Sequence, residues 1–164
     1  MIVCVDVDYR ETAVVTACVG FDAWTDAASA HELVVRSSEP AAAYAPGRFY
    51  ERELPYLRAC LDRFARPIDL VVIDGYVWLA PGQRGLGARL HAAIERPVVG
   101  VAKTAYLSAD SIEVVRGAST RPLYITAEGI DPRLAAEHVR TMHGPFRIPT
   151  HLKRADGLAR GNVT

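Results

Sequence analysis

The sequence has few cysteines, no long apolar run and no excess of charge of either sign. Its three cysteines, Cys4, Cys18 and Cys60, are widely separated and lack the spacing of a zinc site. We expect them to be buried, small apolar residues of a reducing compartment. No stretch of about 18 apolar residues is present to cross a membrane, and the first residues lack the basic leader of a signal peptide. These absences predict a cytoplasmic protein.

Charge and length narrow the possibilities further. Basic and acidic residues each number 19 among the 164 residues, so the formal net charge is zero. This balance excludes a protein that coats nucleic acid by charge alone, although a local basic groove stays possible. The length suits one domain, residues 1–164, with a substantial core. The five histidines form no HxH or HxxxH pair, so we predict no zinc site.

Hydrophobic periodicity predicts an α/β protein with a mixed sheet. Three strand-like stretches come first with no room for a helix between them, which predicts an antiparallel start. Helical and strand patterns then alternate, which is typical of parallel strands with helical crossovers. The expected strands cover residues 2–9, 12–21, 31–38, 68–75, 97–103, 111–117 and 121–129; the expected helices cover 54–66, 83–96, 131–144 and 150–160.

Carboxylates occupy positions in this pattern that suit a metal site. Asp6 lies in the first strand, Asp74 ends a run of four apolar residues, and Glu53 opens the helix that precedes it. If the strands of Asp6 and Asp74 are parallel neighbours, both carboxylates lie near the same end of the sheet. Hard cations such as Mg²⁺ or Mn²⁺ bind carboxylates in this way, together with water and phosphate oxygens.

Each of these acids also has a simpler interpretation. Asp74 followed by Gly75 is typical of a turn, and Glu53 suits a solvated acid at the start of a helix. Asp8 shares a face with Asp6 and is an equal candidate for the ligand on the first strand. Spacing alone does not select the trio.

Five motifs, in order along the chain, resemble those of the endonuclease V family, the enzymes that nick nucleic acid near deoxyinosine or inosine. They are "VDVDY" (5–9), "YAPGRFYERELP" (44–55), "DLVVIDGYVWLAP" (69–81), "RPVVGVAKTAYL" (96–107) and "MHGPFRIPTHLKRADGLAR" (142–160). Each motif is weak alone, whereas "PGxxxxRExP", "vDG" and "GVAK" together are fairly specific.

The resemblance implies a ribonuclease-H-like fold and an Mg²⁺- or Mn²⁺-dependent endonuclease acting on DNA or RNA. By this resemblance Asp6, Glu53 and Asp74 are the metal ligands, and Lys103 lies near the scissile phosphate. Tyr44 and Pro46 match the wedge that enters the duplex beside the lesion. An aromatic or apolar wedge offsets the unstacking cost of extruding a base. Gly75, with the stretch 85–87, is the candidate for close approach to the flipped base.

The sequence also departs from the family pattern. Tyr76, Val77 and Ala80 replace the family's first histidine, second glycine and second histidine, and we expect a larger side chain at Val77 to narrow the base pocket. The family also carries a late histidine motif, and the matching stretch here, "YITAEGIDP" (124–132), contains no histidine; Glu128 is the candidate replacement. These departures leave an alternative: a degenerate homologue that binds nucleic acid or a protein without cutting.

The C-terminal segment is the best candidate for a local phosphate-contacting patch, because it gathers basic residues in a chain of zero net charge. Arg154 is the predicted substrate contact within it. A solvated helix face is the alternative interpretation. The residues of this patch are Arg147, Lys153, Arg154 and Arg160.

Overall fold

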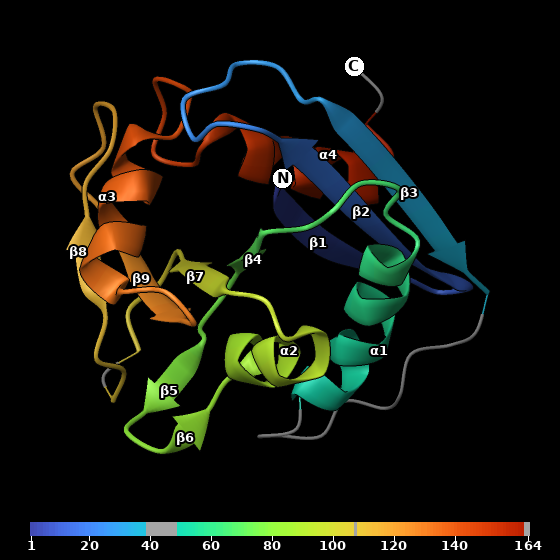
Figure 1. Ribbon diagram of the computed structural model, residues 1–164, viewed down its shortest axis with the longest axis horizontal. Helices are drawn as coiled ribbons and strands as arrows, with labels where there is room; N and C mark the ends of the chain where they lie inside the picture. The colour runs from blue at the N-terminus through green and yellow to red at the C-terminus, as the bar shows by residue number, and fades with distance from the viewer. Residues whose placement is uncertain (39–48, 107, 163–164) are drawn as a thin grey trace.

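A seven-stranded mixed sheet forms the centre of the computed structural model, which describes residues 1–38, 49–106 and 108–162 (Figure 1). The strand order is β3-β2-β1-β4-β7-β9-β8, and β5 and β6 form a separate two-stranded hairpin. The elements in chain order are β1 (Ile2–Arg10), β2 (Ala13–Phe21), β3 (His31–Ser37), α1 (Phe49–Asp62), β4 (Leu70–Asp74), β5 (Trp78–Ala80), β6 (Gln83–Arg84), α2 (Leu86–Ile94), β7 (Val98–Ala102), β8 (Ile112–Val114), β9 (Leu123–Glu128), α3 (Pro132–Thr141) and α4 (Thr150–Ala159).

The pairing confirms the predicted mixed sheet. Strands β1, β2 and β3 pair antiparallel, whereas β1, β4 and β7 lie side by side in parallel. The last two strands differ from the prediction, because β9 runs antiparallel to β7 and β8 runs antiparallel to β9. The parallel centre brings the carboxyl ends of β1, β4 and β7 to one edge of the sheet.

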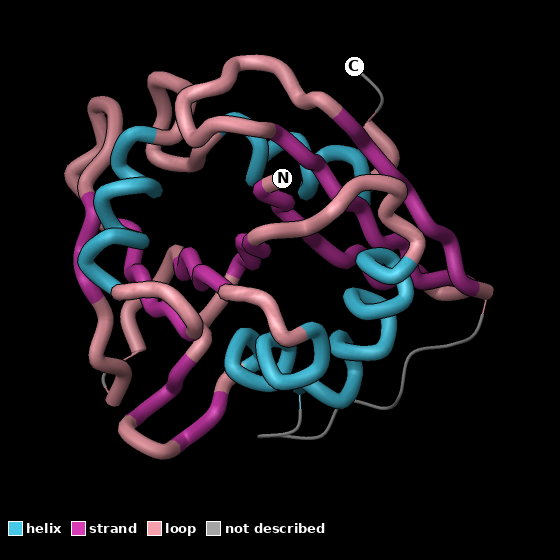
Figure 2. The backbone as a smooth tube through the Cα atoms, in the orientation of Figure 1, coloured by secondary structure: helices cyan, strands magenta, loops and turns pink. Residues whose placement is uncertain are grey.

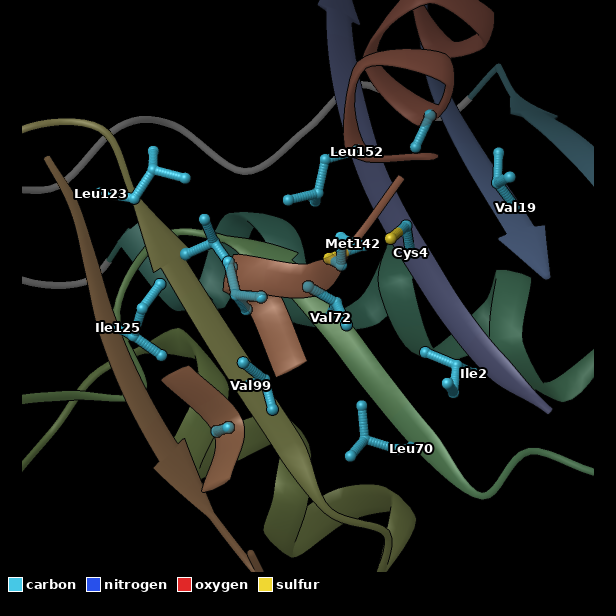
Figure 3. Packing of buried hydrophobic residues seen from close by; sticks show 14 of the residues in the cluster. Ile2, Cys4, Val19, Leu70, Val72, Val99, Leu123, Ile125, Met142 and Leu152 are labelled. Atoms are coloured by element: carbon cyan, nitrogen blue, oxygen red, sulfur yellow. The ribbon is translucent and has the colours of Figure 1, made fainter. Parts of the chain in front are cut away.

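Helices cover both faces of the sheet, so that each face has its own core. Figures 1 and 2 show α1 and α2 on one side and α3 and α4 on the other. The first cluster packs strand residues against α3 and α4, and includes Cys4, Val72, Met142 and Leu152 (Figure 3). The second packs Val3, Val5, Val71 and Ile73 against α1 and α2. We call these sides the α3/α4 face and the α1/α2 face.

The helix boundaries agree in part with those predicted from the sequence. Asp131 caps α3 by accepting hydrogen bonds from the backbone N–H groups of Arg133 and Leu134, as its sequence position predicts. Helix α1 begins at residue 49 rather than 54, so Glu53 lies one turn inside it instead of opening it. The β5–β6 hairpin was not expected, because the stretch after Gly75 carries no clear strand pattern.

The three cysteines are buried and unpaired by disulfides, as expected. Cys18 on β2 and Cys60 on α1 pack with their sulfur atoms 2.9 Å apart and help to join α1 to the sheet. Among the helices of the described ranges, none is both long and apolar enough to cross a bilayer.

Candidate functional site

Strand alternation places the two strand aspartates on the same side of one sheet edge. Val5 of β1 is paired with Ile73 of β4, so the next residues, Asp6 and Asp74, are level with each other. Both continue the alternate positions of Ile2, Cys4, Leu70 and Val72, whose side chains belong to the α3/α4 face. The neighbourhood predicted from the two strands is therefore confirmed.

Glu53 reaches the same edge from α1. It lines a small cavity together with Asp6 and Asp74, closed below by Val5, Ile73 and Leu57. The cavity holds about 20 Å³, which is room for one water-sized group. Asp8 is not among the lining residues; its carboxylate accepts a hydrogen bond from Arg10 at 3.0 Å. The structure thus gathers Asp6, rather than Asp8, with the other two acids.

Burial and mutual repulsion make the ionised form of these carboxylates unfavourable. The pKa of Asp6 is raised from 3.8 to about 6, first by burial and then by the charges of Asp74 and Asp156, while the Val7 N–H and Lys103 oppose the rise. Burial also raises the pKa of Glu53 from 4.5 to about 7, with Asp6 and Asp74 adding to the rise. Such clustering of acids is unfavourable without a compensating cation.

Lys103 supplies a positive charge at this edge. It follows β7, pairs with Asp74 and lines a second small cavity with Asp6, Asp74, Ile148 and Leu152. Within the described ranges, no three acidic, histidine or cysteine side chains converge closely enough to enclose an ion as they stand. One oxygen of Asp74 is engaged by Lys103 and one of Asp6 by the Val7 N–H. The second oxygen of Asp74 and that of Asp6 therefore take no part in these two contacts and face the site as candidate ligands.

A larger pocket of about 210 Å³ opens beside the acids on the α1/α2 face. Its walls are mainly apolar and aromatic, with Arg84 as the cation. Gly75 lines it and has a φ of +143°, a conformation that side chains rarely adopt. The remaining lining residues are Tyr50, Glu53, Asp74, Tyr76, Leu79, Gly85 and Leu86.

Val77 does not narrow this pocket, contrary to the expectation from sequence. Its side chain is fully buried in the core of the α1/α2 face and packs against Gly87 of α2. A Cβ at Gly87 would lie 2.6 Å from a Val77 methyl, so the glycine makes room for the valine. Tyr76 and Leu79 are the bulky residues that do face the pocket.

The Tyr76 hydroxyl ties the pocket wall to the loop after β7. It donates to the Thr104 carbonyl at 2.8 Å and accepts from the Tyr106 backbone N–H at 3.0 Å. The side chain that replaces the family's histidine therefore braces the segment that carries Lys103.

Asp156 of α4 is a site residue that sequence reasoning missed. Its charge acts on Asp6, and its own carboxylate accepts from Arg160 at 2.7 Å. Glu128, the candidate replacement for the missing histidine, instead accepts from the Trp78 indole at 2.7 Å and is paired with Val98, at the start of β7. The sequence signal for Asp156 is its place within the C-terminal motif, residues 142–160, which resembles that of the endonuclease V family.

The other predicted substrate contacts fall elsewhere. Tyr44 and Pro46 lie outside the described residues. Arg154 forms a bidentate ion pair with Glu32 of β3, with N···O distances of 3.0 and 2.9 Å. This ion pair fixes α4 against the sheet. A larger hollow of about 580 Å³ near Phe64 and Arg96 contains none of the clustered acids. We therefore locate the site by its titratable groups and not by cavity size.

Comparison with known proteins agrees with this geometry. The sequence model described as Endonuclease V matches residues 1–119. The chain is 33% identical to the endonuclease V of Streptomyces coelicolor over 181 aligned residues, covering 95% of this chain and 76% of that protein. It is 32% identical to the Streptomyces avermitilis endonuclease V, covering 95% and 77% of the two chains.

Solved structures show the same fold. The Streptomyces avermitilis endonuclease V superposes with a TM-score of 0.82 at 27% identity, over 98% of this chain and 79% of that one. The Ciona intestinalis endonuclease V, bound to DNA containing an inosine, superposes with a TM-score of 0.80 at 14% identity, over 99% and 84%. From the family match and these relatives, this chain belongs to the endonuclease V family, a family of nucleases with a ribonuclease-H-like fold.

Proposed function

We propose that this protein is a metal-dependent endonuclease that hydrolyses a phosphodiester bond in DNA or RNA on the 3′ side of deoxyinosine or inosine. The observation that carries the proposal is the meeting of Asp6, Glu53 and Asp74 around one small cavity beside Lys103. Membership of the endonuclease V family supports it. We further propose that it acts in the cytoplasm, in DNA repair.

The donor set fits Mg²⁺ or Mn²⁺. Carboxylate oxygens are the ligands that these hard cations prefer, and the pKa values of Asp6 and Glu53 are raised first by burial and further by the neighbouring acids, both of which a bound cation would offset. Asp6, Glu53 and Asp74 would hold the ion, with Asp156 near Asp6. When bound, the ion supplies Lewis acidity that favours an ionised water and stabilises a departing oxygen.

The remaining roles belong to side chains of the protein. The Lys103 ammonium, released from Asp74, would neutralise the phosphate at the cleaved bond. The pocket lined by Tyr76 and Leu79 would receive the flipped base, with the Gly75 backbone at close approach. Tyr44 and Pro46 would form the wedge. Arg154 would contact the substrate only by sharing its guanidinium with Glu32.

A cleavage assay with matched acid variants tests the proposal. Substrates are single- and double-stranded DNA and RNA oligonucleotides, each with and without one inosine, in Mg²⁺ or Mn²⁺. Asp6→Asn should reduce cleavage at least about a hundredfold. Asp8→Asn, two residues along the same strand but outside the cavity, should retain it.

Each alternative predicts a different result. Metal-dependent cutting without preference for inosine would limit the proposal to a nuclease with another base specificity. If the folded protein binds oligonucleotides but cuts none, the catalytic proposal fails and the chain is a non-catalytic binding module of this family. Equal activity of both asparagine variants would show that the cavity is not the catalytic site.

A further inference from the structure

The segment after α3 presents an exposed aromatic ring beside the catalytic edge. Phe146 is 64% exposed, the most of the large hydrophobic residues in the described ranges, and it contributes nothing to the core. A single exposed apolar residue is common on protein surfaces, so the significance of this ring depends on what holds it and on what lies next to it.

The next two residues connect Phe146 to the site. The Arg147 guanidinium donates to the backbone carbonyls of Lys103 and Pro122. Ile148 lines the small cavity that also contains Asp6, Asp74 and Lys103. Of these three consecutive residues, Phe146 exposes its ring to solvent, Arg147 fixes the loop to the Lys103 backbone, and Ile148 lines the cavity.

A buried arginine holds this loop in one conformation. Arg116 is only 6% exposed and donates to carbonyls of five residues between 140 and 147, including Phe146 at 3.0 Å and Gly144 at 3.3 Å. Gly117 lets the loop pack closely against it, because a Cβ at this position would lie 2.1 Å from the Pro145 carbonyl oxygen. The ring is therefore presented on a constrained backbone, which lowers the entropy lost when a ligand stacks on it.

A cation accompanies the ring. The Lys153 ammonium lies 5.4 Å from the centre of the Phe146 ring, and Lys153 is on the exposed side of α4. Lys153 precedes Asp156 by three residues, a spacing that makes the two neighbours on the surface of α4, and the charge of Asp156 acts on Asp6. A planar apolar group with an anion beside it suits this pair of side chains.

From these contacts we propose that Phe146 and Lys153 form a stacking platform for an unpaired base of the substrate strand and its phosphate. The proposal rests on the nuclease function above, and it adds a binding site on the α3/α4 face, opposite the base pocket. A nucleic acid fits better than a protein partner because base stacking needs one flat ring and one cation, whereas a protein interface needs a broad apolar patch.

Equilibrium binding tests the platform independently of cleavage. Labelled single-stranded oligonucleotides are titrated with wild type, Phe146→Ala, Phe146→Trp and, as control, Leu134→Ala, another exposed apolar residue, on α3. Phe146→Ala should weaken binding at least about fivefold, because stacking of one base is worth at least this much. Phe146→Trp should bind as well as wild type, and Leu134→Ala should show no change.

Position and charge provide two further readouts. An abasic nucleotide is moved stepwise along the strand; one position should weaken binding by wild type and have no effect on Phe146→Ala. Lys153→Ala should reduce the slope of log affinity against log salt by about 0.7, as for one lost phosphate contact on a single strand.

Two outcomes would overturn the platform. One is equal affinity of Phe146→Ala and wild type; the other is an identical abasic profile for both proteins. Either result leaves the cleavage proposal intact, since cleavage is measured separately with the Asp6 and Asp8 variants. Conversely, a protein that binds through Phe146 but never cuts would retain the platform and lose the nuclease.

Discussion

The clustered carboxylates make stability depend on pH and metal in a direction that the structure fixes. Asp6 and Glu53 have folded-state pKa values of about 6 and about 7, above their ordinary values of 3.8 and 4.5. At pH values between the ordinary and the raised pKa of each acid, Asp6 and Glu53 therefore keep their protons in the folded protein and lose them in the unfolded chain. The resulting stabilisation is complete below pH 4 and is lost as pH rises through 6 to 7.

The size of the effect follows from the same values. At about 1.4 kcal/mol for each pH unit, moving the pKa of Asp6 from 3.8 to about 6 corresponds to about 3 kcal/mol. Glu53 gives a similar figure of about 3 kcal/mol. Because the two acids repel each other, the contributions overlap. We expect the free energy of unfolding to fall by roughly 3–6 kcal/mol between pH 4 and pH 8 without metal.

Urea denaturation at a series of pH values measures this fall. His151 acts in the opposite direction, since burial lowers its pKa and the fold then loses stability as pH falls below 6.5. The informative quantity is therefore the difference between wild type and the Asp6→Asn, Glu53→Gln double variant, which should be large at pH 8 and small at pH 4. In wild type, millimolar Mg²⁺ or Mn²⁺ should restore stability at pH 8 by mass action.

Two results would refute the reasoning. If the double variant and wild type show the same dependence on pH, the two carboxylates are not held at raised pKa values. If neither Mg²⁺ nor Mn²⁺ stabilises wild type at pH 8, or if each stabilises the double variant equally, the acids do not form the metal site. These outcomes do not depend on any activity.

Further predictions concern the surroundings of the site. Gly100→Ala should cost about 1–3 kcal/mol of stability in urea denaturation and reduce activity, because its Cβ would lie 2.5 Å from the Gly75 carbonyl oxygen. Gly157→Ala on α4, where a Cβ would have one ordinary contact at 3.9 Å, should be neutral or stabilising in the same assay. Arg116→Met should cost about 3 kcal/mol, since it leaves buried carbonyls unsatisfied, and should accelerate amide exchange in residues 140–147. Val77→Ala should lose about 2 kcal/mol with unchanged base preference, whereas Leu79→Ala should alter the base preference of cleavage with little loss of stability. A change of base preference in Val77→Ala alone would contradict the packing described here.

The sequence predicted the parts of the site that depend on strand periodicity. Apolar runs ending in Asp74 and containing Asp6 predict two strands, and the two aspartates meet on the condition that these strands are parallel neighbours, which they are. The closeness of the two aspartates is then a consequence of register. Glu53 was predicted by family resemblance, and its reach to the cavity depends on α1 starting earlier than its apolar pattern indicated.

The parts that the sequence did not predict depend on tertiary packing. Asp156 meets Asp6 only because α4 docks along β1, and no local pattern encodes that docking. The direction of Val77 is set by the Thr126 hydroxyl, which accepts its N–H at 2.8 Å, and by the space at Gly87. The β5–β6 hairpin was missed because its strands are only three and two residues long, too short for a period-two pattern.

The two faces of the sheet imply how a substrate strand crosses the site. The pocket proposed to receive the base, with Leu79 and Tyr76, opens on the α1/α2 face, whereas the proposed platform of Phe146 and Lys153 lies on the α3/α4 face. The carboxylates and Lys103 occupy the sheet edge between them. A strand that uses both sites must pass over this edge, which places the cleaved phosphate between the two bound bases. The nucleotide position sensitive to Leu79→Ala and the abasic position sensitive to Phe146→Ala must therefore lie on opposite sides of the cleaved bond.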